Sequence, residues 1–288
     1  MSNVAPGNNR SAELHGVIEH FVNQLAAETE AAKSSAPLLA YLKAAAQFRD
    51  YSIHNTMLIF SQMPTATRVA GFHAWRKLGR FVQKGEKGIA ILAPILVKAN
   101  RDNQREALAC EEEPQVVTRF RTVYVFDVSQ TEGIDLPEPP VLTGAECSDD
   151  LSLALTLYAD EQGIAVRSEK MTGSAMGVSR GGSIVIDERL EGADYFAVLA
   201  HEVAHELLNH RARRDEIDKK CREIEAESIA YTVCQHFGVQ CTAPAYLALY
   251  GADSKDVTAR LENIVGTIQA VISGIDSALT STAHSATG

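Results

Sequence analysis

The chain has 288 residues, of which 45% are hydrophobic and 22% are charged, a composition typical of globular proteins and a length that allows two domains. The polar first ten residues argue against a secretory signal. The longest apolar run, residues 88–97, contains Pro94 and is too short to span a bilayer. Five cysteines without close pairs argue against a disulfide framework. We therefore expect a cytoplasmic protein without membrane contact.

The net charge of −10 is distributed unevenly along the chain. Residues 1–140 contain 15 basic and 15 acidic residues, whereas residues 141–288 contain 12 and 22. Within the first half, residues 68–98 contain seven Lys and Arg and a single acidic residue, Glu86. A basic segment of this density in an acidic protein indicates an anionic partner at that segment.

Four helical segments are predicted in the first part of the chain, because apolar residues recur there with the helical period and a proline or glycine marks the boundaries. Three of them lie within residues 11–62, namely a first segment around residues 14–25, then residues 38–48 and residues 51–62. The fourth covers residues 72–78 and is ended by Gly79.

Three strands are predicted next, and the first two flank a glycine-bounded turn. They cover residues 81–84, 89–97 and 118–128. Residues 100–115 are polar and acidic and are expected to form a surface loop. The proline-rich residues 136–144 are the predicted linker between one domain of residues 1–140 and another of residues 141–288.

Aromatic residues alternate with the basic ones in this N-terminal part. Rings that stack on unpaired bases, beside cations that hold phosphates, are what binding of single-stranded nucleic acid requires. The competing interpretation is that Trp75, the only tryptophan, belongs to the core. The candidate contacts are Tyr51, Phe72, Trp75, Arg76, Lys77, Arg80, Lys84 and Lys87.

The second half is predicted to open with a helix over residues 149–162 and a strand over residues 164–167, and to close with an amphipathic helix over residues 258–279. Residues 181–187 form a further predicted strand, just before a segment rich in histidine and glutamate. We expect this strand to lie at a sheet edge, where a peptide can add as an extra strand.

The sequence His201-Glu202-Val203-Ala204-His205 is the strongest functional signal. On a helix, residues four apart share a face, so both histidines can offer a ring nitrogen to one zinc ion. Glu202 is rotated by about 100° from His201 and can take a proton from a water molecule beside that metal. Because the flanking residues are apolar, histidines placed there by chance would be costly. The motif therefore predicts a zinc peptidase site with Glu202 as the catalytic base.

A third protein ligand is expected on the next helix, residues 215–237, which Gly238 ends. Glu223 falls on the apolar, alanine-lined face of this helix, and we predict it as the ligand. Glu227, one turn further, is predicted to hold a ligand histidine through its other ring nitrogen.

Glu225 is the alternative ligand. It falls with Thr232 and His236 on a more polar side of the helix, where a solvated side chain is the simpler interpretation. The residue that stabilises the oxyanion is left open by the sequence, and the candidates are Tyr195, His210, Tyr231 and His236.

Four motifs of the first half point to a known family. They are Tyr51-Ser52-x-x-Asn55-x-x-Leu58, Val69-Ala70-Gly71-Phe72-x-x-Trp75, Gly79-Arg80-x-Val82-x-Lys84-Gly85-Glu86-Lys87-Gly88 and Val125-Phe126-Asp127-Val128-Ser129-Gln130-Thr131. Together they resemble the N-terminal domain of ArdC-type antirestriction proteins over about residues 11–140. The resemblance implies a gene carried by a mobile element, a first domain that binds single-stranded DNA, with Asn55 among the contacts, and a second domain with a zincin-like metallopeptidase fold.

Residues 222–230 are similar to the helix of ImmA/IrrE-type metallopeptidases, in which the first Glu of a Glu-x-x-Ala pattern ligates zinc. That position is Glu223 here, so this second resemblance favours Glu223 independently of the helical spacing.

These observations predict an α+β protein of two domains. The first is a mixed helix and antiparallel-sheet domain that binds single-stranded DNA, and the second is a zincin-like domain of the gluzincin type. His201, His205 and Glu223 would hold one Zn²⁺, or another divalent metal, per chain. The implied function is antirestriction, with the restriction machinery or an unidentified protein substrate as a partner.

Two other functions stay open at this point. The chain could be a single-stranded DNA-binding protein whose metal site is structural or inactive. It could also be an ImmA-like regulatory peptidase that cleaves a repressor, with the first domain as a targeting device.

Overall fold

The computed structural model describes residues 7–32, 36–97, 117–136, 148–172, 175–241 and 254–285. The chain divides into two compact units, which we describe separately. Unit 1 comprises residues 1–20 and 58–134, and unit 2 comprises residues 21–57 and 135–288. Residues 21–57 thus group with the C-terminal half, whereas the predicted boundary near residue 140 places them in the N-terminal domain. That domain boundary stays a prediction. The predicted loop at residues 100–115 and most of the predicted linker lie outside the described residues.

The helices predicted in the N-terminal half are confirmed. They are α1 (Gly7–Ala32), α2 (Ala36–Gln47), α3 (Ile53–Gln62) and α4 (Phe72–Lys77). Their apolar residues recur at helical spacing, and in α1 this places Leu14, Ile18, Val22 and Leu25 on one buried stripe. Gly79 adopts φ 73° directly after α4, a conformation that favours glycine and ends the helix.

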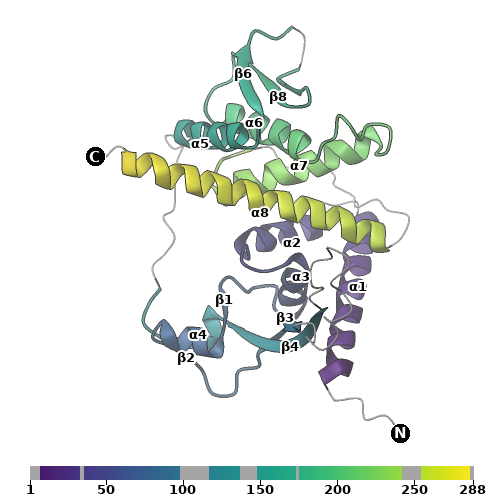
Figure 1. Ribbon diagram of the computed structural model, residues 1–288, viewed down its shortest axis with the longest axis vertical. Coiled ribbons are helices and arrows are strands. Elements are labelled where there is room, and N and C mark those ends of the chain that lie inside the picture. The colour runs from purple at the N-terminus through teal and green to yellow at the C-terminus, as the bar shows by residue number, and fades with distance from the viewer. Residues whose placement is uncertain are drawn as a thin grey trace, which may run out of the picture. The chain divides into compact units, whose positions relative to one another are not determined.

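Unit 1 contains two small antiparallel sheets (Figure 1). In the first, β4 (Val117–Asp127) lies between β1 (Val69–Gly71) and β3 (Ile89–Val97). In the second, β2 (Arg80–Val82) pairs with β5 (Thr131–Gly133). Both strands predicted at residues 89–97 and 118–128 are confirmed, and the whole of β3 pairs with residues 117–125 of β4.

The motif Val125–Thr131 holds these sheets together. The Asp127 carboxylate accepts hydrogen bonds from the backbone of Thr67 and Arg68 and caps the short 3-10 helix η2 (Val128–Gln130). Gln130 donates to Glu86 and to the carbonyl of Lys87. The residues that carry the family resemblance here therefore have a structural role, because they join β4 to the turn before β3.

Unit 2 is a helical layer with one small sheet. Its helices are α2, α5 (Ser148–Glu161), α6 (Gly192–Leu207), α7 (Lys219–His236) and α8 (Ser254–Ser285). The sheet has the order β6-β8-β7, in which β6 (Ala165–Glu169) runs parallel to β8 (Ser183–Asp187) and β7 (Gly177–Ser179) runs antiparallel to it. The expectation that residues 181–187 form an edge strand is wrong. They form the central strand β8, which is nearly fully buried, and the edge strand that packs on α6 is β7.

Helix α8 is the apolar centre of unit 2. It packs against α5, α7 and α2, and its buried residues follow a single stripe from Val257 to Ala278. Residues Val257–Thr282 are long and apolar enough to cross a membrane by length and composition alone. Their apolar stripe is buried between helices, which accounts for the same composition. The prediction of an amphipathic helix over residues 258–279 is confirmed.

Candidate metal centre

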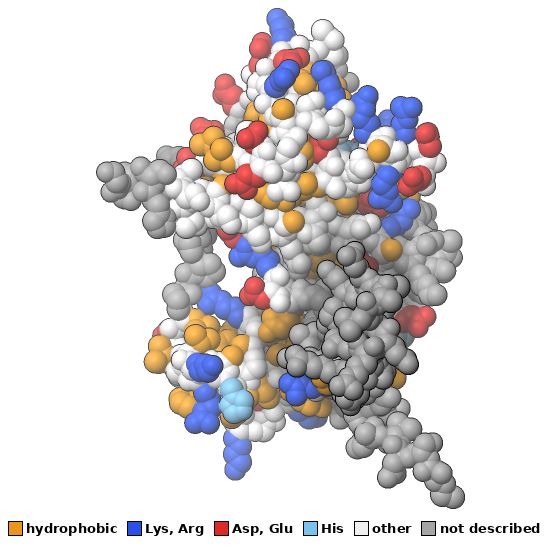
Figure 2. Space-filling model, viewed as in Figure 1, with side chains coloured by type: hydrophobic (Ala, Val, Ile, Leu, Met, Phe, Trp, Pro, Cys, Tyr) orange, Lys and Arg blue, Asp and Glu red, His pale blue; other side chains and the backbone are white. Residues whose placement is uncertain are grey.

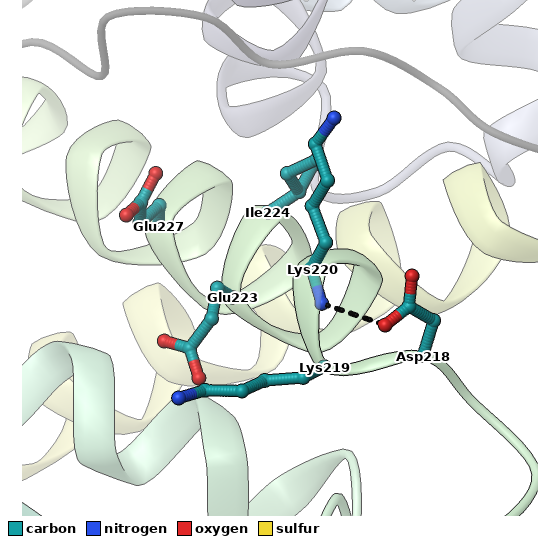
Figure 3. A pocket seen from close by; sticks show the side chains of 6 residues that line it. All are labelled: Asp218, Lys219, Lys220, Glu223, Ile224 and Glu227. Atoms are coloured by element: carbon teal, nitrogen blue, oxygen red, sulfur yellow. Dashed lines mark hydrogen bonds between the residues drawn. The ribbon is translucent and has the colours of Figure 1, made fainter.

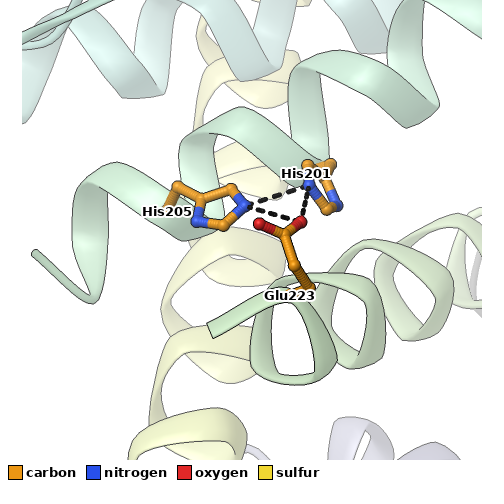
Figure 4. Close-up of side chains that lie close together, drawn as sticks. All are labelled: His201, His205 and Glu223. Atoms are coloured by element: carbon orange, nitrogen blue, oxygen red, sulfur yellow. Dashed lines mark hydrogen bonds and ion pairs between the residues drawn. The ribbon is translucent and has the colours of Figure 1, made fainter. Parts of the chain in front are cut away.

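Three side chains converge between α6 and α7 (Figure 4). His201 and His205 lie one turn apart on α6, and their Nε2 atoms are 3.0 Å apart. Glu223 lies on α7, and its Oε2 is 3.6 Å from the Nε2 atom of each histidine. The two helices pack side by side, with the apolar face of α6, including Phe196, Leu199 and Val203, fully buried.

The spacing of these three atoms fits a small divalent metal. Ligand atoms about 2.0–2.1 Å from a tetrahedral ion lie about 3.4 Å from one another, and the observed separations of 3.0 and 3.6 Å fall on either side of that value. Two imidazoles and one carboxylate are a donor set that zinc accepts in sites with a fourth, open position. The structure thus brings together the three residues predicted as ligands, although their role as ligands stays a prediction.

The charges around the site are coupled. Burial lowers the pKa of the His201 imidazole, but the hydrogen bond that it donates to Glu223 and the nearby carboxylates outweigh burial, so that the pKa is raised on balance. The hydrogen bonds from His201 and then His205 hold the pKa of the Glu223 carboxyl far below its usual range. Glu223 is therefore an ionised carboxylate facing two imidazoles, which favours binding of a cation.

Glu202 lies on the same helix and faces the edge strand β7. Its side chain is buried, and burial raises the pKa of its carboxyl, although His201 and His205 act in the opposite direction. A Cβ atom on Gly177 of β7 would lie 2.9 Å from Glu202 Oε1 and 2.7 Å from Val198. Since only glycine leaves this space free, Gly177 lets the edge strand approach Glu202. The predicted base therefore lies between the two histidines of α6 and the edge strand β7.

Glu206, one turn after Glu202, ties the end of α6 to the turn between β7 and β8. Its carboxylate accepts hydrogen bonds from Ser179 Oγ at 2.6 Å and from the backbone of Gly181 and Gly182 at 2.7 and 2.6 Å. The structure shows that it fixes the position of β7 relative to α6.

The expectation that the Glu225 side chain is solvated is wrong. Instead of lying on a solvated side of α7, Glu225 is 3% exposed. Its Oε2 is 2.9 Å from Nε2 of His210, and its Oε1 accepts a hydrogen bond from Arg260 of α8. The cause is that α7 packs on α6, α2 and α8, so its polar side is buried as well as its apolar side. His210 in turn contacts His205, with 2.8 Å between their Nδ1 atoms.

Glu227 lies one turn beyond Glu223 and is exposed. Figure 3 shows both side chains projecting from successive turns of α7 into an open pocket of about 470 Å³. The Glu227 carboxylate contributes to the raised pKa of the His201 imidazole. The support of a ligand histidine by Glu227 stays a prediction, whereas the ring of His205 is supported by His210, which the sequence offered only as an oxyanion candidate.

The residues predicted to contact DNA divide into four groups. Trp75 is 2% exposed and donates from Nε1 to the Phe126 carbonyl, so it is a core residue and the stacking prediction for it is wrong. Arg80 is buried, and its guanidinium donates to Thr131 and Ile134, so it does not face a phosphate. Tyr51 and Asn55 are half-buried and belong to unit 2.

The remaining candidates are exposed on unit 1. Figure 2 shows Lys and Arg side chains beside hydrophobic ones over the region of α4 and β2. Phe72 is 44% exposed, and Phe81, a further aromatic residue of the basic segment 68–98, is 52% exposed. The exposed cations of this surface are Arg76, Lys77, Lys84 and Lys87.

The fold and the converging side chains define an α+β protein with a candidate divalent-metal site. Residues 15–126 match the family model of the N-terminal domain of anti-restriction factor ArdC. This part of the chain is therefore similar to the ArdC N-terminal domain family, and the resemblance to ArdC-type antirestriction proteins noted from the sequence motifs is confirmed.

Comparison with individual proteins extends beyond that domain. An uncharacterized protein of Bacillus anthracis, pXO2-81, is 27% identical over 258 residues, covering 76% of this chain and 44% of that protein. The chain thus spans less than half the length of this curated relative. The crystal structure of antirestriction ArdC protein from the R388 plasmid in its Mn(II)-bound form has a TM-score of 0.50 and 16% identity, with 91% of this chain and 97% of that one covered. The metal-free form gives a TM-score of 0.47. At this identity the Mn(II)-bound structure shows a shared fold.

Removal of any one of the three converging side chains should abolish tight metal binding, because two remaining ligands cannot hold the ion well in an open site. We expect His201→Ala, His205→Ala and Glu223→Ala to bind less than stoichiometric zinc, measured by elemental analysis and chelator competition. Glu227→Ala should lower the affinity by about 10–100-fold if its carboxylate supports a ligand. Unchanged affinity in the Glu223→Ala variant would remove Glu223 from the ligand set.

The interaction between His201 and Glu223 should also make the thermal stability of the metal-free protein depend on pH. The raised pKa of His201 stabilises the fold below the ordinary value of 6.5, and this contribution is lost as pH rises through the raised value. The lowered pKa of Glu223 stabilises it above the ordinary value of 4.5, and this contribution is lost as pH falls. Glu223→Gln should therefore lower the Tm most between pH 4.5 and 6.5. If the difference in Tm between the wild type and Glu223→Gln is constant from pH 4 to 9, the proposed interaction between the two side chains is contradicted.

Proposed function

We propose that this chain is an antirestriction protein of a mobile element, which binds single-stranded DNA through unit 1 and carries a metal-dependent peptidase site in unit 2. The observation that carries the proposal is the convergence of His201, His205 and Glu223, with Glu202 beside them, in a chain that also contains an ArdC N-terminal domain. Unit 2 would then be a zincin-like domain. Its support is the order of parts, in which a sheet with an antiparallel edge strand is followed by the His-Glu-x-x-His helix and a second helix that supplies a glutamate.

The metal would be Zn²⁺ or another divalent ion, one per chain. The Mn(II)-bound crystal structure of R388 ArdC supports a divalent metal in a protein of this fold. The two imidazoles and one carboxylate of this chain favour zinc among the common divalent ions, since imidazole is a preferred zinc ligand. A metal bound here would act as a Lewis acid toward a peptide carbonyl.

The protein side of the reaction follows from the positions of Glu202 and β7. A peptide that pairs with the open edge of β7 would lie over Gly177, next to the Glu202 carboxylate. Glu202 would accept the proton of the attacking water and pass it to the amine that leaves. The raised pKa of its carboxyl, caused first by burial, suits a group that must both take and release a proton. Glu206 would keep β7 at the right distance from this carboxylate.

Single-stranded DNA would bind at the exposed surface around α4 and β2. Phe72 and Phe81 are the rings available for stacking on unpaired bases, in place of the buried Trp75. Arg76, Lys77, Lys84 and Lys87 supply four exposed cations for phosphates. In this proposal the protein acts in the cytoplasm, without membrane contact, and protects incoming DNA either by covering it or by cleaving a component of the restriction machinery.

DNA binding of the whole chain should show a preference for single strands with little sequence dependence, because rings can stack only on unpaired bases. We expect Phe72→Ala with Phe81→Ala to weaken binding and leave the salt dependence nearly unchanged. Lys84→Glu with Lys87→Glu should flatten the salt dependence, whose log–log slope is about −0.7 per phosphate neutralised on single strands. Fluorescence anisotropy at several salt concentrations measures both effects. Equal affinity for duplex and single strand would exclude the stacking surface.

Glu202→Gln separates the two activities. Gln is nearly the same size but cannot accept the proton, so the variant should retain metal and DNA affinity while losing peptide hydrolysis. Its effect in cells is measured by the transfer efficiency of a plasmid that carries sites for a restriction enzyme. Lost protection in the variant supports a peptidase acting on restriction machinery, whereas full protection indicates that DNA binding carries the function. Cleavage of a repressor in place of restriction machinery would identify the ImmA-like alternative.

A further inference from the structure

The two ring nitrogens of His205 have different neighbours. Nε2 lies 3.0 Å from Nε2 of His201 and 3.6 Å from the carboxylate of Glu223, so it faces the proposed metal position. Nδ1 points the other way and lies 2.8 Å from Nδ1 of His210. A metal takes the lone pair of one imidazole nitrogen and leaves the hydrogen on the other. With a metal at Nε2, therefore, Nδ1 of His205 donates its hydrogen to His210.

The same reasoning fixes the hydrogen on His210. Because its Nδ1 accepts from His205, its own hydrogen is on Nε2, which lies 2.9 Å from Oε2 of Glu225. An ionised carboxylate only accepts hydrogen bonds, so Glu225 requires this tautomer of His210. The hydrogen bonds run in one direction, from His205 to His210 and from His210 to Glu225.

Arg260 completes the arrangement from α8. Its Nη1 donates to the other carboxylate oxygen of Glu225, Oε1, at 3.3 Å. His210 and Glu225 are each 3% exposed, so the charge of Glu225 is balanced by Arg260 rather than by water. With both oxygens occupied in this way, Glu225 is not available as a metal ligand, although it is only two positions from Glu223.

We propose that His210 and Glu225 are positioning residues of the metal centre. They hold the ring of His205 in the one orientation and tautomer that presents Nε2 to the metal, and Arg260 anchors them to α8. This inference rests on the proposed metal site and names the residues that orient one of its ligands. Neither residue touches the metal position.

The test compares metal binding by full-length variants. His210→Phe keeps a flat ring of similar size but removes the acceptor, and Glu225→Ala removes the group that selects the tautomer. We expect each to lower zinc affinity by about 10–100-fold, as for other partners of ligand histidines. Competition with a chromogenic chelator gives the affinity. The visible absorption of the cobalt(II)-loaded protein, which reports ligand geometry, should also change.

Conservative variants and a control separate positioning from packing. In His210→Gln the amide can accept from His205 and donate to Glu225, so this variant should recover most of the affinity and the cobalt(II) spectrum. Ser228→Ala alters a fully buried side chain of the same helix that bonds only to a backbone carbonyl, and it should bind metal as the wild type does. The double variant of His210→Phe with Glu225→Ala should lose no more affinity than His210→Phe alone, because both substitutions break the same hydrogen-bond network.

The possible results are distinct. Wild-type affinity and an unchanged cobalt(II) spectrum in His210→Phe would overturn the positioning role. Losses of affinity in His210→Gln and Ser228→Ala as large as the loss in His210→Phe would also overturn it. If the wild-type protein itself takes up no divalent metal, the proposed metal site fails instead. Thermal unfolding of each metal-free variant shows whether it is folded. Because His210→Phe and Glu225→Ala remove different hydrogen-bonding groups, the test needs only one of the two variants to fold.

Discussion

The packing of α6 against α7 is the constraint on which the candidate site depends, because its three converging side chains come from both helices and neither helix can form the site alone. The turn between the helices sets their register. Asn209 adopts φ 53°, a left-handed conformation that asparagine tolerates, and Asp218 caps α7 through the backbone of Lys220. Arg222 donates to the carbonyls of Arg214 and Ile217, which holds the end of the turn against α7. A shift of α7 by one residue would rotate Glu223 by about 100° away from the histidines.

Charged groups buried at this helix interface have an energetic cost that the structure offsets locally. Removing one partner of a buried ion pair costs about 3–5 kcal/mol, because the remaining charge has no compensation. Glu225 avoids this cost through His210 and Arg260. Apolar residues would fill the same volume at a lower cost. Retention of these groups is therefore better explained by orientation of the site than by stability of the fold.

Local rules were sufficient for the helices and for the convergence of the three candidate ligands, but not for the surroundings of α7. The four-residue spacing of His201 and His205 is a property of any helix, so the sequence predicts it directly. The choice of Glu223 rested on an alanine-lined face, and that face does meet α6. Spacing along one helix gives no information on how many neighbours it has. Because α8 covers the other side of α7, Glu225 is buried, and only the three-dimensional arrangement reveals its partners.

The same limitation explains Trp75 and Arg80. Their residue types suit nucleic-acid binding as well as they suit a core, and burial decides between the two. Trp75 is buried because its indole N–H reaches the Phe126 carbonyl across the sheet, a contact between residues 51 positions apart in the sequence. Sequence patterns report exposure reliably only where one face of an element is solvated. In a short helix such as α4, of six residues, the pattern is too brief to show which face that is.

The division into units has a consequence for how the activities can be separated. The boundaries fall within α1 and α3, and residues 21–57 belong to the compact unit that contains the metal centre. Within that unit α2 packs on α7 and α8, and its residues Leu38, Tyr41 and Leu42 are fully buried. A fragment that ends near residue 140 would keep α2 without α7 and α8, and would expose this apolar surface to water at about 25 cal/mol per Å². Point substitutions in the whole chain, which leave both units intact, are therefore the sounder way to assign DNA binding and metal chemistry to their residues.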